Sequence, residues 1–343
     1  MKKNITIRDI AEALHTTPST VSRALAGSPR IGESMKEAVR AMAESMGYIP
    51  NARAVSLRTG KGTLIGVIVP SINRDFFSSI IDGIESVASE KGYNIIIGQS
   101  RDEVEREKAL VDEMFRCRVD GLIVCLAYTT SNYDHFMPVW RCGLPLIFCD
   151  RSPKNLTTAR VNIDDYQAAC SSAEHLVQQG CRRIAFFGGA ENVDVFFERK
   201  KGYLDVMNKY GLPVIPSLVH EDAITFEKGK AAARKVLSLK KSEYPDGLFA
   251  CEDYTAIGAL TVFRENGFRV PEDLCICGFG NEEIASYVPP GITSIDQSSF
   301  EQGYQASLLF FEAQKSSDPS KFTTTMTLPS RLVIRGSSMR HPL

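Results

Sequence analysis

The sequence predicts a small all-α head that contains a helix-turn-helix, followed by a two-lobed α/β core built from parallel, doubly wound sheets. Three observations predict this fold class. Apolar side chains recur at helical spacing through residues 1–50. From Thr63 onward, apolar strands alternate with amphipathic helices, which is typical of parallel sheets buried on both faces. The alternation restarts after Asp164, so we expect two lobes with a ligand cleft between them.

Three helices are expected in the head. Thr6 is placed to cap "IRDIAEAL", where Asp9 completes a capping box. The tight turn "HTT" leads to the second helix, "PSTVSRAL", with Thr17 as N-cap and Pro18 at the first helical position. The longer third helix runs through "SMKEAVRAMAESM" and is expected to stop at Gly47. Two short helices joined by a tight turn are typical of a helix-turn-helix.

The second helix has two different faces. Val21 and Leu25 lie four residues apart and form an apolar stripe, which leaves Ser19, Ser22 and Arg23 on other faces. Any small helical hairpin could carry such a helix, so its function depends on the rest of the chain.

Charge is distributed unevenly between the head and the core. Residues 1–60 contain nine Lys or Arg and five Asp or Glu, a net charge of +4. Since the whole chain has a formal charge of −1, the remainder carries −5. A basic head on an acidic body indicates a module that binds a polyanion. The alternative is a set of helices whose basic faces are merely solvated.

The expected elements of the core follow one another in regular order. Strands are expected at 64–70, 93–100, 120–127, 144–150, 159–164, 182–189 and 246–253, and helices at 76–92, 105–119, 165–180, 197–211 and 255–267. Between head and core, "NARAVSLR" is too short to be a stable helix alone and should fold only when something holds it.

Several function classes find no support in the residue pattern. The nine cysteines form no Cys-x-x-Cys pair, and several lie in apolar runs, so no metal site is expected. No signal peptide or membrane-length apolar run is present, which predicts a cytoplasmic protein without a membrane partner. The five histidines are scattered and no nucleophile elbow or Walker loop occurs, so we expect neither an enzyme nor a cofactor.

The chain resembles the LacI/GalR family of bacterial transcription regulators, of the lactose-repressor and purine-repressor type. The resemblance rests on the order and spacing of "TIRDIAEAL", "STVSRAL", "MGYIPNARAVSLRTG", "RDFF", "RVDGLIV", "ERKKGY" and "EDYTAIGAL". It implies a repressor that binds palindromic operator DNA as a homodimer and responds to a small, sugar-like effector in a periplasmic-binding-protein-like core. "RLVIRGSSMRHPL" has no heptad pattern, which favours a dimer over a tetramer. A stand-alone sugar-binding protein and an α/β enzyme are the alternatives.

The resemblance also implies domain limits. These are a DNA-binding domain at 1–50, a hinge helix and linker at 51–62, and an effector-binding core at 63–343, with an N-lobe of about 63–163 and 296–325 and a C-lobe of about 164–295 and 326–341.

Two segments are expected to contact DNA by this resemblance. In the recognition helix they are Thr17, Pro18, Ser19, Thr20, Ser22 and Arg23, and in the hinge they are Asn51, Arg53, Ala54, Leu57 and Arg58. Arg23 suits the O6/N7 pair of a guanine in the major groove. Leu57 matches the wedge that opens a base step in the minor groove. The other interpretation of Leu57 is a linker residue packed on the core.

The effector-binding residues that the resemblance implies are Phe76, Phe77, Asp150, Arg199, Glu252 and Gln297. A guanidinium at Arg199 offers a rigid fork of donors, although a surface arginine in a charged run is the other interpretation. Asp150 ends a strand and should point into the crevice. The phenylalanines could stack on a ligand ring or pack in the core. Asp253 is expected to cap the helix that begins at Tyr254.

One departure from the family pattern bears on the ligand. Gly280 in "GFGNEE" stands where the family often has an acidic residue, and Glu252 stands where an Asn is common. A carboxylate is therefore lost from one side of the cleft and gained on another. A sugar or glycan fragment is the expected ligand, with a nucleoside or a phosphorylated metabolite as alternatives.

Overall fold

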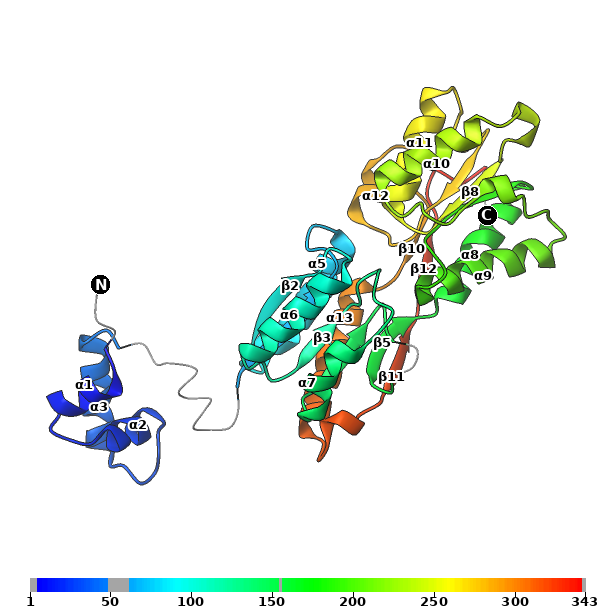
Figure 1. Cartoon of the computed structure of the whole chain (residues 1–343). Helices are drawn as coiled ribbons and strands as arrows, with labels where there is room; N and C mark the ends of the chain where they lie inside the picture. Colours follow the sequence, from blue (N-terminus) through cyan, green and yellow to red (C-terminus); the bar gives the residue numbers. More distant parts are fainter. Residues whose placement is uncertain (1–4, 49–61, 154–155, 341–343) are drawn as a thin grey trace. The chain divides into compact units, whose positions relative to one another are not determined.

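A computed structural model describes residues 5–48, 62–153 and 156–340 of the chain (Figure 1). The chain divides into two compact units, Met1–Gly62 and Thr63–Leu343. The predicted hinge residues Asn51, Arg53, Ala54, Leu57 and Arg58 lie outside the described residues. We refer to the first unit as the head and to the second as the core.

The head consists of α1 (Ile7–Ala13), α2 (Pro18–Leu25) and α3 (Glu33–Ser45). All three contribute to one small hydrophobic cluster, whose fully buried side chains include Ile10, Val21 and Val39. The apolar spacing seen in the sequence therefore makes the core of a three-helix unit.

The predicted helix boundaries of the head are formed by their predicted caps. Thr6 and Asp9 make a reciprocal capping box at α1, and Thr6 N donates to Asp9 Oδ2 at 2.7 Å. Thr17 accepts a hydrogen bond from Thr20 N at 3.2 Å, with Pro18 at the first position of α2. Gly47 follows α3 with φ of +65°, a left-handed conformation that favours glycine. These three predictions are confirmed.

The N-lobe of the core contains a six-stranded parallel sheet in the order β11-β5-β4-β3-β1-β2. Its strands are β1 (Leu64–Val69), β2 (Asn94–Gln99), β3 (Leu122–Val124), β4 (Leu146–Cys149), β5 (Ala159–Ile163) and β11 (Thr325–Leu328). The helices of this lobe are α5 (Asp75–Glu90), α6 (Val104–Arg116), α7 (Met137–Arg141) and α13 (Ser299–Lys315). The predicted doubly wound architecture is confirmed for this lobe.

The last strand of this sheet corrects a lobe limit. Residues after 325 were expected in the C-lobe, but β11 pairs with β5 from Thr325 opposite Arg160 to Leu328 opposite Ile163. Backbone hydrogen bonding to the edge of the sheet thus keeps the chain in the N-lobe as far as Leu328.

The C-lobe contains a four-stranded parallel sheet in the order β7-β6-β8-β9. Its strands are β6 (Ile184–Phe187), β7 (Val219–His220), β8 (Gly247–Ala250) and β9 (Cys275–Cys277). Its helices are α8 (Asp165–Gln178), α9 (Asp194–Lys209), α10 (Phe226–Leu237), α11 (Asp253–Glu265) and α12 (Glu283–Tyr287). An antiparallel pair, β10 (Ser294–Asp296) and β12 (Arg331–Val333), lies where the chain passes between the lobes (Figure 1).

Close packing of α5 against α13 depends on two glycines. A Cβ on Gly83 would collide with the carbonyl oxygen of Phe300, and one on Gly303 with that of Ile80. The two helices therefore approach backbone to backbone, and α5 carries several side chains of the site from this fixed position.

None of the helices in the described ranges is long and apolar enough to span a membrane.

Candidate functional site

The outer face of α2 presents the polar side chains predicted to contact DNA. Pro18, Ser19 and Arg23 are exposed, whereas Val21 and Ala24 are buried in the head. Thr20 and Ser22 are half-buried. The helix thus separates an apolar inner face from a polar outer face, as its sequence indicates.

The hydroxyl of Thr17 is already engaged within the head. It caps α2 and lies 2.8 Å from Ser19 Oγ and 2.9 Å from Thr20 Oγ1. These contacts fix the first turn of α2, which is the part of a recognition helix that faces base edges.

A cleft of about 280 Å³ lies between the two lobes of the core. Phe76, Phe77, Asp150, Arg199, Glu252 and Gln297, the six side chains predicted from the sequence, all line it. Asp150 follows β4 of the N-lobe, and Glu252 follows β8 of the C-lobe. The cleft is therefore at the carboxyl ends of the parallel strands, where α/β folds bind ligands.

Arg199, from α9, is 2% exposed and fully engaged. Its Nε donates to Asp165 Oδ1 at 2.7 Å, Nη1 donates to the carbonyl of Cys251 at 2.9 Å, and Nη2 donates to Gln297 Oε1 at 3.2 Å. Its guanidinium carbon also lies 3.6 Å from the centre of the Phe279 ring. Arg199 is thus an organising side chain in the wall of the cleft rather than an arginine on the surface.

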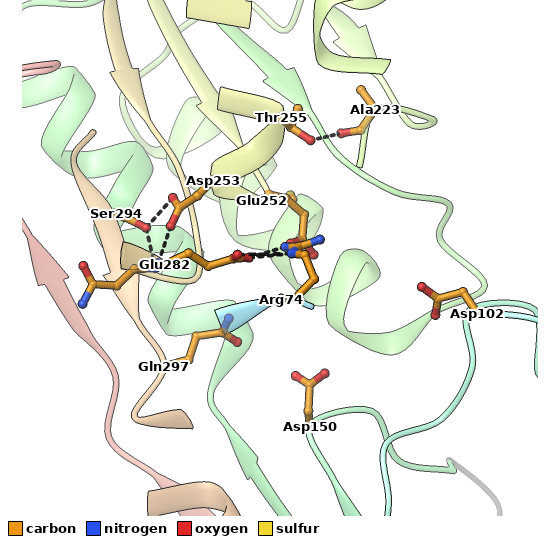
Figure 2. Close-up of polar contacts among 12 residues, drawn as sticks. Arg74, Asp102, Asp150, Ala223, Glu252, Asp253, Thr255, Glu282, Ser294 and Gln297 are labelled. Carbon is orange, nitrogen blue, oxygen red and sulfur yellow. Dashed lines mark hydrogen bonds and ion pairs between the residues drawn. The ribbon is translucent and has the colours of Figure 1, made fainter. Parts of the chain in front are cut away.

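Arg74 connects the two lobes, and sequence reasoning missed it. This residue precedes α5 in the N-lobe, yet its Nη2 donates to Glu252 Oε2 at 2.7 Å and its Nε donates to Glu282 Oε1 at 2.9 Å (Figure 2). Glu282 follows β9 of the C-lobe and is 2% exposed. Burial raises the pKa of the Glu282 carboxyl to about 7, although Arg74 acts in the opposite direction. One cation therefore holds two carboxylates of the opposite lobe.

The lobes also touch elsewhere. The Glu283 amide donates to Asp75 Oδ2 at 3.0 Å, on the same side as Arg74. The Ala190 amide of the C-lobe donates to the Tyr128 hydroxyl of the N-lobe at 2.8 Å. Any change in the angle between the lobes must break or remake these contacts.

Asp150 and Arg151 are neighbours at the end of β4. Asp150 has φ of +63°, a left-handed conformation that is uncommon outside glycine, and its carboxyl group points into the cleft (Figure 2). Arg151 Nη1 donates to Asp102 Oδ1 at 2.5 Å. Burial raises the pKa of Asp150 to about 7, while Arg151 and Arg199 lower it and Asp165 and Glu252 raise it further. Asp150 Oδ2 lies 3.8 Å from Arg151 Nε, so its cationic neighbour is within ion-pair range but beyond hydrogen-bond distance.

The two phenylalanines pack in the core and also reach the cleft. Phe76 and Phe77 line the cleft and also belong to the hydrophobic core of the N-lobe. Their rings meet edge to face, with centroids 5.0 Å apart. They provide an apolar part of the N-lobe wall.

The expected role of Asp253 is wrong. Helix α11 begins at Asp253, its N-cap is Glu252, and the Asp253 carboxylate accepts from Ser294 Oγ at 2.6 Å and from the Glu282 amide at 2.8 Å (Figure 2). Asp253 therefore positions the backbone of Glu282 instead of capping its own helix. Gly280 has φ of +124°, which favours glycine, and a Cβ built on it would lie 3.6 Å from Asp253 Oδ2.

Signals for the missed residues were weak in the sequence. Arg74 stands two residues before Phe76 in "RDFF", a stretch that carries the family resemblance, and Glu282 stands two residues after Gly280 in "GFGNEE", the stretch that departs from the family pattern. Their pairing joins residues more than two hundred positions apart, which no local pattern indicates. No group of three or more His, Cys, Asp or Glu side chains in the described parts of the chain is arranged to hold a metal ion.

Comparisons with known families agree with this division of the chain. Residues 6–51 match the model for bacterial regulatory proteins of the lacI family, and residues 173–338 match a periplasmic binding protein-like domain. A solved structure of the transcription regulator CcpA of Lactococcus lactis is 25% identical, with a TM-score of 0.73 over 81% of this chain and 100% of that one. The lac repressor dimer bound to operator has the same fold, with 24% identity and a TM-score of 0.83 over 98% and 99% of the two chains.

Relatives of known role align over almost the whole length. The transcriptional repressor CytR of Escherichia coli K12 is 30% identical over 337 residues, which cover 98% of this chain and 97% of CytR. Catabolite control protein A of Priestia megaterium is 31% identical over 98% and 99% of the two chains. These relatives are transcriptional regulators rather than enzymes. With a helix-turn-helix head and a two-lobed ligand-binding core, the chain belongs to the LacI family of bacterial transcription regulators.

Proposed function

We propose that this regulator is a cytoplasmic repressor whose affinity for a palindromic operator is set by a sugar-like effector bound between the lobes. One observation carries the proposal: six side chains from distant parts of the sequence line a single cleft at the carboxyl ends of two parallel sheets. The cleft combines the apolar rings of Phe76 and Phe77 with charged side chains that converge from both lobes, and convergent polar groups in a concave site are typical of small-molecule binding.

Operator recognition is assigned to α2 and the hinge. The exposed Pro18, Ser19 and Arg23 face base edges of the major groove, and Arg23 donates to a guanine. Thr17, Thr20 and Ser22 lie where they fix the helix and contact phosphates. In the hinge, Leu57 is the wedge that opens a central base step of the operator, and Ala54 lies at the floor of the minor groove. Three further hinge residues contact the phosphate backbone of the DNA: Asn51, Arg53 and Arg58.

The regulator acts as a dimer, because a two-fold symmetric operator needs two heads. The large apolar side chains exposed on the described part of the core include Ile72, Ile97, Tyr287 and Phe300. Ile97 lies on β2, an edge strand of the N-lobe sheet, and an exposed apolar edge favours association with a second copy. Sedimentation should give a mass near two protomers, and a mass near four would contradict the proposal.

Coupling requires that the effector bind two lobe arrangements with different affinity. The contacts of Arg74 and Tyr128 across the cleft exist in the arrangement described here. An effector that enters the cleft shifts the balance between this arrangement and another, and with it the spacing of the hinges.

The test is operator binding by the full-length protein to a palindromic site selected from random DNA. Arg23→Ala should lose about 1–3 kcal/mol on the selected site and relax preference at one base pair. Arg40→Ala removes an equal charge from the exposed surface of α3 and serves as the matched control. If Arg23→Ala weakened binding to every sequence equally, as loss of a phosphate contact does, its assignment to a base would be wrong.

A further inference from the structure

We propose that Cys181 and Cys275 of the C-lobe form a redox-active dithiol, which a hydroperoxide converts to a disulfide in the folded protein. The two cysteines lie at the amino ends of the C-lobe strands, whereas the cleft lies at the carboxyl ends. The dithiol is therefore separate from the effector site and goes beyond the proposed function.

A glycine brings the two thiols to one face of the C-lobe sheet. Cys181 lies in the turn between α8 and β6, and Cys275 is the first residue of β9. Gly247 on β8 pairs in register with Cys275, so both residues face the same side of the sheet. A Cβ on Gly247 would lie 3.1 Å from Cys181 Sγ, so this sulfur occupies the space over the glycine. Since neighbouring strands are about 4.8 Å apart, the two thiols meet, and they interact directly.

One arginine covers both thiols. Cys181 Sγ donates to the Asp246 carbonyl at 3.2 Å, and Cys275 Sγ donates to the Pro271 carbonyl at 3.7 Å. Arg340 binds the same two carbonyls, from Nη2 to Asp246 at 2.9 Å and from Nε to Pro271 at 2.7 Å. Its Nη1 also lies 3.7 Å from Cys181 Sγ. A positive charge is therefore held directly over the pair.

The two thiols differ as nucleophiles. Cys181 has one proton, which it donates to the Asp246 carbonyl while Cys275 is a thiol and to Cys275 once that sulfur is ionised. This hydrogen bond lowers the pKa of Cys275, and Arg340 acts in the same direction, although burial opposes both. The same contact raises the pKa of Cys181. Because the thiolate is the reactive form of cysteine, Cys275 is the attacking sulfur.

Oxidation then takes two steps. The Cys275 thiolate attacks one oxygen of the hydroperoxide, so an S–O bond forms and the O–O bond breaks. The departing hydroxide or alkoxide takes up the proton that Cys275 released. The Cys181 sulfur attacks the resulting sulfenic acid, so the S–S bond forms, the S–O bond breaks, and the hydroxyl leaves as water with the Cys181 proton. The peroxide accepts the two electrons that the thiols lose.

A second pair of neighbouring cysteines provides a contrast in the same chain. Cys125 and Cys149 follow and end the paired strands β3 and β4, and their side chains also interact. Both belong to the hydrophobic core of the N-lobe, where the contact with Cys149 and burial raise the pKa of Cys125. All four sulfurs are buried. Moving the half-buried Arg340 opens the C-lobe pair, whereas the N-lobe pair opens only with its core.

The test maps thiol oxidation in the full-length protein. The starting protein carries Cys117→Ser, Cys142→Ser and Cys170→Ser, because these cysteines are not buried. It is treated with hydrogen peroxide, denatured in N-ethylmaleimide, digested and analysed by mass spectrometry. We expect the number of free thiols to fall by two, with one cross-linked peptide pair that joins Cys181 to Cys275 and is released by dithiothreitol.

The N-lobe pair is the internal control of this experiment. Cys125 and Cys149 should remain alkylated as free thiols at the peroxide concentration that closes the C-lobe pair. The proposal is overturned if the N-lobe pair closes as fast, or if thiols are lost without a link between Cys181 and Cys275. Retention of all free thiols overturns it too.

Two substitutions test which sulfur reacts first. In Cys181→Ser the hydroxyl keeps a donor beside Cys275, so Cys275 should accumulate as a sulfenic acid that dimedone labels. In Cys275→Ser, dimedone should label Cys181 about tenfold less, because Cys181 remains protonated. Cys277→Ser, on the same strand as Cys275, is the matched control and should keep the cross-link. Equal labelling in the first two variants would overturn the assignment of Cys275 as the nucleophile, and the peptide map of the unsubstituted pair tests the disulfide without either variant.

Discussion

The head and the core place their predicted functional side chains in opposite environments. In the head, Pro18, Ser19 and Arg23 are exposed on a helix whose caps and buried stripe are set within a few residues. In the core, Asp150 is 7% exposed and Arg199 is 2% exposed, and both face charges from distant segments. The comparison shows that an exposed polar helix face needs only a well-made local scaffold. A buried polar cleft instead needs each charge to be balanced through the tertiary fold.

The largest expected effect is the loss of Arg199. Arg199→Ala leaves Asp165 buried without its cation and frees the Cys251 carbonyl. We expect the core to lose about 3–5 kcal/mol of unfolding free energy, together with its effector response. Amide hydrogen exchange on the full chain would show faster exchange in α8 and α9, with α1–α3 unchanged.

The matched control for this change is an exposed arginine of a surface pair. Arg116→Ala removes a guanidinium that lies 4.0 Å from Asp112 on α6, where both side chains are largely exposed. It should alter stability by less than about 1 kcal/mol. Equal effects of the two substitutions would contradict the contrast between buried and surface charges.

An intermediate effect is expected from pH. Folding raises the pKa of Asp150 from 3.8, and that of Glu282 from 4.5, to about 7 because both are buried. At a pH between the unfolded and the folded pKa of each group, the folded core thus binds more protons than the unfolded chain. Its unfolding free energy should therefore fall as the pH rises toward 7, by up to about 1.4 kcal/mol per pH unit for each group.

The head supplies the contrast within the same molecule. A hydrogen bond from Lys36 lowers the pKa of the exposed Glu33, so its contribution is present above pH 4.5 and is lost only in acid. Amide hydrogen exchange followed in each unit during chemical unfolding should show a loss of stability from pH 4.5 to pH 7 in the core and not in the head. Asp150→Asn should remove part of it, and an unaltered slope in that variant would refute the assignment.

The smallest expected effect concerns a cap of the head. Thr6→Ala removes the hydroxyl half of the capping box at α1 and leaves the backbone hydrogen bond from residue 6 to Asp9, which should cost the head about 1 kcal/mol. Exchange protection in α1 should fall while the sheets of the core keep theirs. Loss of protection in the core would contradict the division into two units.

Much of this molecule could be predicted from local pattern. The helices of the head, the strand and helix alternation of the core and the strand-end position of Asp150 follow from short stretches, whereas the cleft-lining positions of Arg199 and Glu252 follow from the family resemblance. Asp253 was misassigned, because Ser294 and the Glu282 amide compete for its carboxylate across the fold. Arg74 was overlooked because its partners lie in the other lobe.

The sequence by itself determined the head, the order of the core elements and the family of the regulator, because caps, periodicity and motif spacing act over short distances. Only the tertiary structure decided how charges in the cleft are shared. Whether Arg74 neutralises Glu282, and which charges surround Asp150, depends on which strand ends meet across the lobes. Burial then amplifies those pairings, since a charge removed from water depends on its few neighbours for all of its stabilisation.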